Sequence, residues 1–410
     1  MDNELSEKKP LLARQPIFDS GLAVAAYELL FRNSETNEAN VIDGEDSATS
    51  QVLLSAFSEN DISQLTGVVP GFVNFTKNLL LSDVPFDKKG LVIEVLEDIT
   101  DSNEVILAIT ELKNQGYTIA LDDFVYSPDK TELIKLCDII KVDLMAYPDR
   151  KAFLADVKKI QRTRKRLLAE KIETHEEFEL CKALGFELFQ GYFFAKPQLI
   201  KGKRLSYNKQ VVLTLIAQFQ SPDVKWSDLE SALLKDPELT FKLLKLVNSA
   251  AYSKGRKVTS VKQALTWLGL KKIKSWVILL SLSNLDDKPK ELTAVALVRA
   301  KTCELLSKKF DSIDSDIFFT VGMLSCLPAF MDVPMKLLLE KLPLSEEVVQ
   351  ALLHYKGHLG IVLAAVLAHE NGLWDKINWK LLKTMQIHDQ DINTFYRTAV
   401  TWSNEYIHDV

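Results

Sequence analysis

The sequence has few of the features that mark secreted, membrane-spanning or nucleic-acid-binding proteins. Its four cysteines are scattered and form no C-x-x-C pair, which argues against a zinc finger and indicates a reducing compartment. No apolar run approaches the roughly 20 residues that a membrane span requires, and the polar start shows no signal peptide. The net charge of -6 gives no reason to expect binding to a nucleic acid polymer or to anionic lipid. We therefore expect a cytoplasmic protein that binds neither a membrane nor nucleic acid.

The hydrophobic pattern changes once along the 410 residues, which predicts two domains. Over residues 11–204, short apolar runs alternate with helical stretches, a pattern typical of a modified (β/α)8 TIM-like barrel. Its first two runs, 13–18 and 24–31, lie close enough to form a hairpin, so one strand should be antiparallel. Beyond a basic linker the pattern is helical, which predicts an all-α domain over 205–390 and a C-terminal tail over 391–410.

Individual elements follow from apolar periodicity and from start and stop signals. Further strands are expected at 71–75, 91–95, 119–121, 139–143, 167–170 and in a run that ends at 190. Helices are expected at 47–57, 103–114, 150–163 and 174–184, and in the second half after Asp236-Pro237 and over 261–268. Gly116 and Gly269 are expected to end two of these helices.

Two adjacent carboxylates, Asp122 and Asp123, follow the apolar run Ile119-Ala120-Leu121, where a buried strand should end. Like charges at such a place are costly unless a cation neutralises them. Polar residues also fall at the ends of the other expected strands: Glu28, Asn74, Glu94, Lys141, Glu170 and Gln190. Carboxylate and amide oxygens suit Mg²⁺ or Mn²⁺, and a pair of such ions is usual for phosphodiester hydrolysis. The alternative is that this rim holds only ion pairs and unrelated carboxylates.

Six motifs follow one another over residues 11–200: Ala13-Arg14-Gln15-Pro16-Ile17, Tyr27-Glu28-Leu29-Leu30-Phe31-Arg32, Leu121-Asp122-Asp123-Phe124, Lys141-Val142-Asp143, Ala169-Glu170-Lys171-Ile172-Glu173-Thr174 and Gln190-Gly191-Tyr192-Phe193-Phe194-Ala195-Lys196-Pro197. In sequence and in order they resemble the motifs of the EAL family, the bacterial phosphodiesterases that linearise cyclic di-GMP. The resemblance implies a metal-dependent hydrolase that gives the linear dinucleotide pGpG and acts in second-messenger control of motility and biofilm formation.

The resemblance also implies a role for each matching residue. Metal ligands for Mg²⁺ or Mn²⁺, as two ions, are implied at Glu28, Asn74, Glu94, Asp122 and Asp123. Catalytic roles are implied for Lys141, which would hold the attacking water, for Glu170 as general base or ligand of the second ion, and for Glu173. Contacts with the dinucleotide are implied for Gln15, Arg32, Gln190 and Pro197, and support of the loop after the acids for Glu97.

Two departures from the family pattern stand out. The name-giving motif reads Glu-Leu-Leu, a mild apolar change. The family's continuation after Asp-Asp-Phe is rich in glycine, whereas this chain has Val125-Tyr126-Ser127-Pro128-Asp129. Valine and tyrosine do not take positive φ cheaply, and proline lacks an N–H donor, so this loop is expected to follow a different path.

The second half has three runs that carry a further resemblance, at residues 234–240, 247–250 and 264–269. They resemble the HDOD domain, a helical relative of metal-dependent HD phosphohydrolases. Ser325-Cys326 stands where those hydrolases carry His-Asp, so a metal cannot be held in the same way. The spacing of His354, His358 and His369 is read as coincidence, since no acid accompanies them. This half is expected to be a regulatory module that engages a signalling protein, in a chain that could also form a homodimer.

Two functions of different classes remain open. The first is a phosphodiesterase that opens cyclic di-GMP, which the retention of every implied ligand favours. The second is a noncatalytic cyclic di-GMP receptor or protein-interaction scaffold, which the altered loop at 125–130 favours.

Overall fold

The computed structural model divides the chain into two compact units, residues 1–193 with 370–372, and residues 194–369 with 373–410. It describes residues 11–32, 62–82, 88, 90–125, 130–147, 149–197, 206–221, 223–234, 237–248, 258–285, 287–310 and 314–407. The helix expected at 47–57, the loop residues 126–129 and the domain boundary expected near 205 lie outside these ranges.

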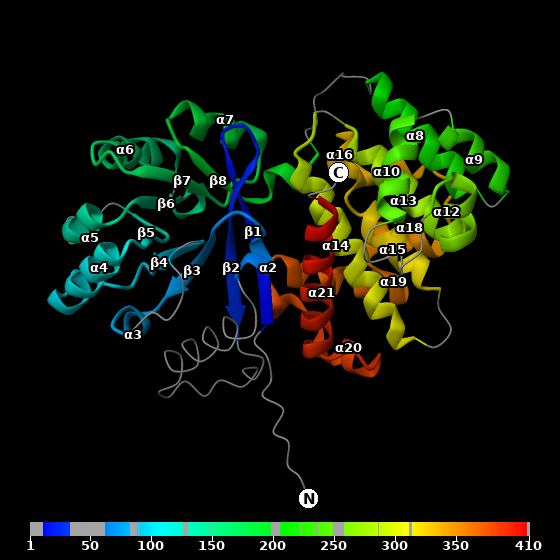
Figure 1. The fold of residues 1–410 in the computed structure, drawn as a ribbon. Helices are drawn as coiled ribbons and strands as arrows, with labels where there is room; N and C mark the ends of the chain where they lie inside the picture. The colour runs from blue at the N-terminus through cyan, green and yellow to red at the C-terminus, as the bar shows by residue number, and fades with distance from the viewer. Residues whose placement is uncertain are drawn as a thin grey trace, which may run out of the picture. The chain divides into compact units, whose positions relative to one another are not determined.

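The first unit contains a closed barrel whose strands follow one another in sequence order (Figure 1). The strands are β1 (Leu11–Asp19), β2 (Val24–Arg32), β3 (Gly71–Phe75), β4 (Leu91–Val95), β5 (Thr118–Leu121), β6 (Ile139–Asp143), β7 (Arg166–Glu170) and β8 (Leu188–Gln190). Strand β1 is antiparallel to both of its neighbours, β2 and β8, and every other pair is parallel. The expected modified barrel with one antiparallel strand is confirmed.

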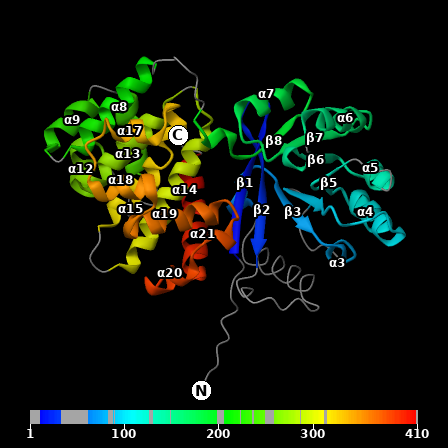
Figure 2. The ribbon, with the colours of Figure 1, turned by 180° about the vertical axis from the view of Figure 1, so that it is seen from behind.

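Helices connect the parallel strands and lie outside the barrel (Figures 1 and 2). They are α2 (Ile62–Thr66), α3 (Lys77–Leu80), α4 (Asn103–Gln115), α5 (Thr131–Leu136), α6 (Arg150–Gln161) and α7 (His175–Ala183). Gly116 ends α4 in the left-handed conformation at φ 96°, as expected from its position after the last apolar residue. Thr174 caps the start of α7 in a capping box with Glu177. Local sequence signals therefore set the end of α4 and the start of α7.

One apolar side chain from each strand fills the middle of the barrel. These buried residues are Ile17, Ala26, Phe72, Val92, Ala120, Ile139, Leu168 and Leu188. Side chains alternate between the two faces of a strand, so residues two positions away from these also point inward. This layer therefore fixes which polar residues can meet above it.

The described residues of the second unit form helices and no strand. The helices are α8 (Tyr207–Gln220), α9 (Trp226–Leu234), α10 (Pro237–Val247), α12 (Val261–Leu268), α13 (Leu270–Ser283), α14 (Lys290–Leu306), α15 (Ser315–Leu324), α16 (Leu327–Met331), α17 (Met335–Leu339), α18 (Glu346–His354), α19 (Gly357–Glu370), α20 (Trp379–Thr384) and α21 (Asp389–Ile407). Ser260 caps α12 by accepting a hydrogen bond from Gln263 N, and Gly269 ends this helix. Most of the segment expected as a tail belongs to α21, which packs against α14 and buries Ile392 and Tyr396.

One stretch of the described residues, Glu346–Glu370, is long and apolar enough to pass a length-and-composition test for a membrane span. It consists of α18 and α19, which are separated at Tyr355, a residue in the left-handed conformation at φ 53°. Of its most apolar window, 44% is buried inside the protein. Buried core helices pass the same test, so this is weak evidence for a span.

Candidate functional site

A ring of polar side chains lies directly above the apolar layer of the barrel. Each member is two residues further toward the rim than a residue of the apolar layer, either on the same strand or, for Asp122, directly after the end of β5. The members, which we call the polar layer, are Gln15, Glu28, Asn74, Glu94, Asp122, Lys141, Glu170 and Gln190. Strand β1 runs in the opposite direction, so its member precedes its apolar residue. The structure thus brings together seven of the polar residues that were predicted at strand ends, and Gln15, which only the family resemblance had marked, lies among them.

Lys141 stands at the centre of the polar layer. Its side chain is completely buried, at 0% exposure. Its Nζ lies 2.5 Å from Glu94 Oε1, 2.6 Å from Asp122 Oδ1, 2.9 Å from Glu170 Oε1 and 3.4 Å from Glu28 Oε1. One ammonium therefore meets four carboxylates, which leaves an excess of negative charge if all of them ionise.

Burial and this charge imbalance shift the proton affinities. Burial raises the pKa of Glu94 well above its usual value, and the attraction of Lys141 offsets this only in part. Burial also raises the pKa of Glu170, to about 8, against the same attraction. Burial alone would lower the pKa of Lys141, but the surrounding carboxylates raise it well above the ordinary value. Lys141 is therefore charged, and two of the acids beside it, Glu94 and Glu170, retain their protons unusually well.

Hydrogen bonds join the polar layer across the seam where the barrel closes. Gln190 on β8 donates from Nε2 to Glu28 Oε2 and, at 3.1 Å, to Gln15 Oε1. Gly191 follows immediately, at φ 147°, and a Cβ there would lie 2.1 Å from Ile172 O. Only glycine fits at this point, and it holds the end of β8 against the loop that follows Glu170.

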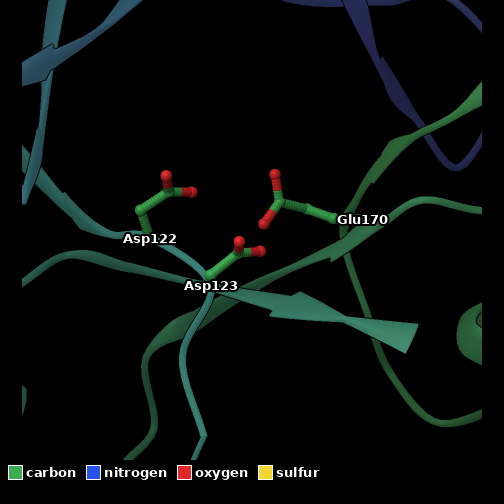
Figure 3. Close-up of side chains that lie close together, drawn as sticks. All are labelled: Asp122, Asp123 and Glu170. Carbon is green, nitrogen blue, oxygen red and sulfur yellow. The ribbon is translucent and has the colours of Figure 1, made fainter. Parts of the chain in front are cut away.

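Three carboxylates converge at the rim: Asp122, Asp123 and Glu170 (Figure 3). Each offers an oxygen within 4.8 Å of the other two. Burial raises the pKa of Asp123, the adjacent charge of Asp122 raises it further, and Lys171 opposes both. Figure 3 shows Asp122 and Asp123 rising from adjacent positions, with Glu170 reaching toward them from a different strand.

Several buried oxygens in the polar layer have no hydrogen-bond partner among the described residues. They are Asn74 Oδ1, Glu94 Oε2, Glu170 Oε2 and Gln190 Oε1. Buried polar atoms are rarely left in this state, and each one costs stability. An all-oxygen set with unsatisfied acceptors and excess negative charge fits a hard divalent cation such as Mg²⁺ or Mn²⁺.

The remaining predicted site residues lie outside the polar layer. Arg32 ends β2 and is half-buried, Glu173 is exposed in the loop after β7, and Pro197 is half-buried beyond β8. Glu97 is exposed, and its carbonyl oxygen accepts a hydrogen bond of 2.6 Å from Lys130 Nζ. The implied roles of these four residues stay predictions.

Sequence reasoning gave no role to Lys171 and Asp143, which form an ion pair of 2.6 Å at the same rim. Asp143 could have been found from the sequence, because it is a charged residue at the end of the expected strand 139–143. Nothing in the pattern marked the lysine, because its reach depends on a left-handed backbone at φ 55°.

In the helical unit, Ser325 and Cys326 bind a buried arginine. Arg299 Nη1 donates to Ser325 Oγ at 2.8 Å and to Cys326 Sγ at 3.1 Å. His354 ends α18, whereas His358 and His369 belong to α19. His369 is buried and accepts a hydrogen bond of 3.2 Å at Nδ1 from Trp374 Nε1. Among the described residues, the only group of acids, histidines or cysteines that could hold a metal is the one at the barrel rim.

Two family models match parts of the chain. The family model of the EAL domain matches residues 60–197, and that of the HDOD domain matches residues 205–338. The cyclic di-GMP phosphodiesterase CdgJ of Vibrio cholerae is 32% identical over 399 residues, which cover 96% of this chain and 92% of the relative. The chain belongs to the EAL–HDOD family.

Two further relatives were found for this EAL–HDOD protein. The uncharacterized protein YuxH of Bacillus subtilis is 34% identical over 383 residues, which cover 89% of this chain and 91% of the relative. Among solved structures, a standalone EAL protein from Vibrio cholerae O395 in its c-di-GMP bound form is 24% identical. That match covers 47% of this chain and 94% of the other, with a TM-score of 0.38.

Proposed function

We propose that this EAL–HDOD protein hydrolyses cyclic di-GMP to the linear dinucleotide pGpG, using two Mg²⁺ or Mn²⁺ ions. The observation that carries the proposal is the polar layer: one inward side chain per strand, with Lys141 between four carboxylates. The EAL match and the name of the relative CdgJ support the choice of substrate. We further propose that the reaction takes place in the cytoplasm and serves second-messenger signalling.

The proposed ligands follow from position in the polar layer and from the unsatisfied oxygens. Glu28, Asn74, Glu94 and Asp122 would hold one ion, and Asp123 with Glu170 would contribute to the second. When bound, the ions would stabilise the negative charge that develops on the phosphoryl group and make a water a better nucleophile.

The protein's own groups would handle the water and its proton. Lys141 Nζ, fixed by carboxylates on four strands, would hold the attacking water in position. Glu170 would either accept the proton of this water or hold the second ion, and its buried Oε2, which has no hydrogen-bond partner among the described residues, is the oxygen available for either role. The water oxygen would bond to phosphorus as the bond from phosphorus to the ribose 3′ oxygen breaks, and that oxygen would take up its proton from solvent water.

The helical unit is proposed to regulate the barrel or to bind a signalling protein. Where metal-dependent relatives would need ligands, Arg299 places a buried cation against Ser325 and Cys326. A fixed positive charge and a hydroxyl are a poor metal site, which favours a binding role over a second hydrolase.

The test is to incubate the purified full-length protein with cyclic di-GMP and Mn²⁺ and to detect pGpG by chromatography and mass spectrometry. Glu28→Ala and Asp122→Ala should each abolish turnover, whereas Glu179→Ala, a change at an exposed acid on α7, should not. Calorimetric titration of cyclic di-GMP should accompany the assay. Tight binding without turnover in the wild type would instead favour the receptor function.

A further inference from the structure

A second lysine at the rim, Lys171, lies directly on one of the converging carboxylates. Its Nζ is 3.4 Å from both Oδ1 and Oδ2 of Asp123, so the ammonium faces the open side of that carboxylate. The same Nζ is 2.6 Å from Asp143 Oδ2. A cation of the protein therefore sits where Asp123 would present its oxygens to a metal ion.

The backbone is shaped to make this contact. Both Asp123 and Lys171 adopt the left-handed conformation, at φ 38° and φ 55°. Residues with a Cβ seldom adopt it, because the Cβ crowds the backbone. In the sheet register Asp143 is the partner of Glu170, so Lys171 begins beside the acid that it binds. Asp143 is itself held, since its Oδ1 accepts a hydrogen bond of 2.7 Å from Met145 N.

The two rim lysines differ in how freely they can move. Lys141 is 0% exposed and bound by four carboxylates, so it is a permanent part of the polar layer. The side chain of Lys171 is 49% exposed and that of Asp123 is 37% exposed, whereas that of Asp143 is only 10% exposed. Lys171 can therefore leave Asp123 for solvent while it keeps its shorter contact with Asp143.

We propose that Lys171 is a tethered counter-ion that covers Asp123 when the second cation is absent, and that an incoming divalent ion must displace it. The inference rests on the proposed metal-dependent function. Two cations cannot share the oxygens of one carboxylate without repulsion, so each contact that Lys171 makes with Asp123 weakens binding of the ion there. The ion near Asp122, Asp123 and Glu170 should consequently be the more weakly held of the two, and Lys171 should act as a positioning residue that sets the metal concentration needed for activity.

The test measures metal binding directly, by calorimetric titration of Mn²⁺ into the metal-free full-length protein. Lys171→Gln should tighten the weaker site by about tenfold, the effect expected of removing one partly screened charge, and should leave the tighter site unchanged. Lys171→Arg keeps the charge and should bind Mn²⁺ like the wild type.

Lys182→Gln supplies the matched control. It removes the same charge from α7, where Nζ donates to the carbonyl oxygen of Ser20 in the β1–β2 turn, at the end of the barrel opposite the rim. Its weaker Mn²⁺ site should not change.

Each remaining outcome is decisive. Equal affinities in Lys171→Gln and wild type, with two sites present in both, would overturn the counter-ion role and leave the metal-dependent function standing. Weaker binding in Lys171→Gln would show that Lys171 supports the site and does not compete for it. No Mn²⁺ binding by either protein would overturn both this inference and the proposed metal dependence.

Discussion

Replacing Glu170 by glutamine should stabilise the barrel when no metal is bound. In the folded protein burial raises the pKa of Glu170 to about 8, against an ordinary value of 4.5. The folded state therefore holds this proton more tightly than the unfolded state. Protonated Glu170 therefore adds to the stability of the folded state fully below about pH 4.5, and this stabilisation is lost as the pH rises toward about 8.

The size of the effect follows from the two pKa values. The whole difference between the two pKa values corresponds to about 5 kcal/mol in the free energy of unfolding. At pH 7.5 about 4 kcal/mol of this stabilisation has been lost. For a domain of this size, 1 kcal/mol shifts the melting temperature by about 2–4 °C. Glutamine cannot ionise, so Glu170→Gln should melt about 10 °C above the wild type at pH 7.5, and the gap should vanish near pH 4.5. Lys141 keeps three other carboxylates, so the variant does not leave its charge without partners.

The assay is scanning calorimetry in a chelator, followed over pH 4.5 to 8 for wild type, Glu170→Gln and the exposed control Glu179→Gln. The transition that rises when Mn²⁺ is added to the wild type identifies the barrel. A Glu170→Gln barrel that melts at or below the wild-type temperature at pH 7.5 would refute the reasoning. So would an equal rise in Glu179→Gln.

Three further changes test other parts of the structure. Lys141→Met should lower the stability of the metal-free barrel by about 3–5 kcal/mol, because three buried carboxylates and the half-buried Asp122 lose their counter-charge. Denaturant unfolding in a chelator measures this loss, and an unchanged midpoint would contradict it. Gly191→Ala should lower the stability of the barrel by at least about 2 kcal/mol, since the added Cβ would meet the Ile172 backbone. Calorimetry measures this loss, and a melting temperature equal to that of the wild type would show that the loop can move aside. Asn248→Ala should destabilise the helical unit by about 1–3 kcal/mol, because this side chain exchanges hydrogen bonds with Val258 N and O; a shift confined to the barrel transition would count against it.

The architecture was predictable because its signals are local. Alternating apolar runs and helical stretches gave the barrel, and the short spacing of the first two runs gave the antiparallel hairpin. The polar layer could also be predicted from the sequence, since on each strand or directly after it a polar residue lies two positions from an apolar one. That rule identifies Gln15 as well, although it entered only through the family resemblance.

Other features depend on tertiary detail that periodicity does not encode. The meeting of Lys141 with four acids follows from barrel closure, which places different strands around one point. The contact between Lys171 and Asp123 depends on the left-handed backbone of both residues. Neither residue is a glycine, so the sequence gives no sign of this conformation. The segment of α21 had a local signal, since Ile392, Tyr396 and Val400 are spaced as on one face of a helix, but the residues from 391 were expected only as a C-terminal tail.

The pairing of β1 with β8 has a consequence for how the protein is made. Ile17 lies opposite Gln190, so the barrel strand that is synthesised first must wait for the barrel strand that is synthesised last before the barrel closes. Until then both strands are open edges, and open edges invite pairing with other chains. Gln190 also supplies the bonds to Glu28 and Gln15, so the polar layer is completed at the moment of closure. A chain that ends before residue 190 should therefore be aggregation-prone and should also lack a complete polar layer. Only chains that are synthesised through β8 can both close the barrel and form the proposed active site.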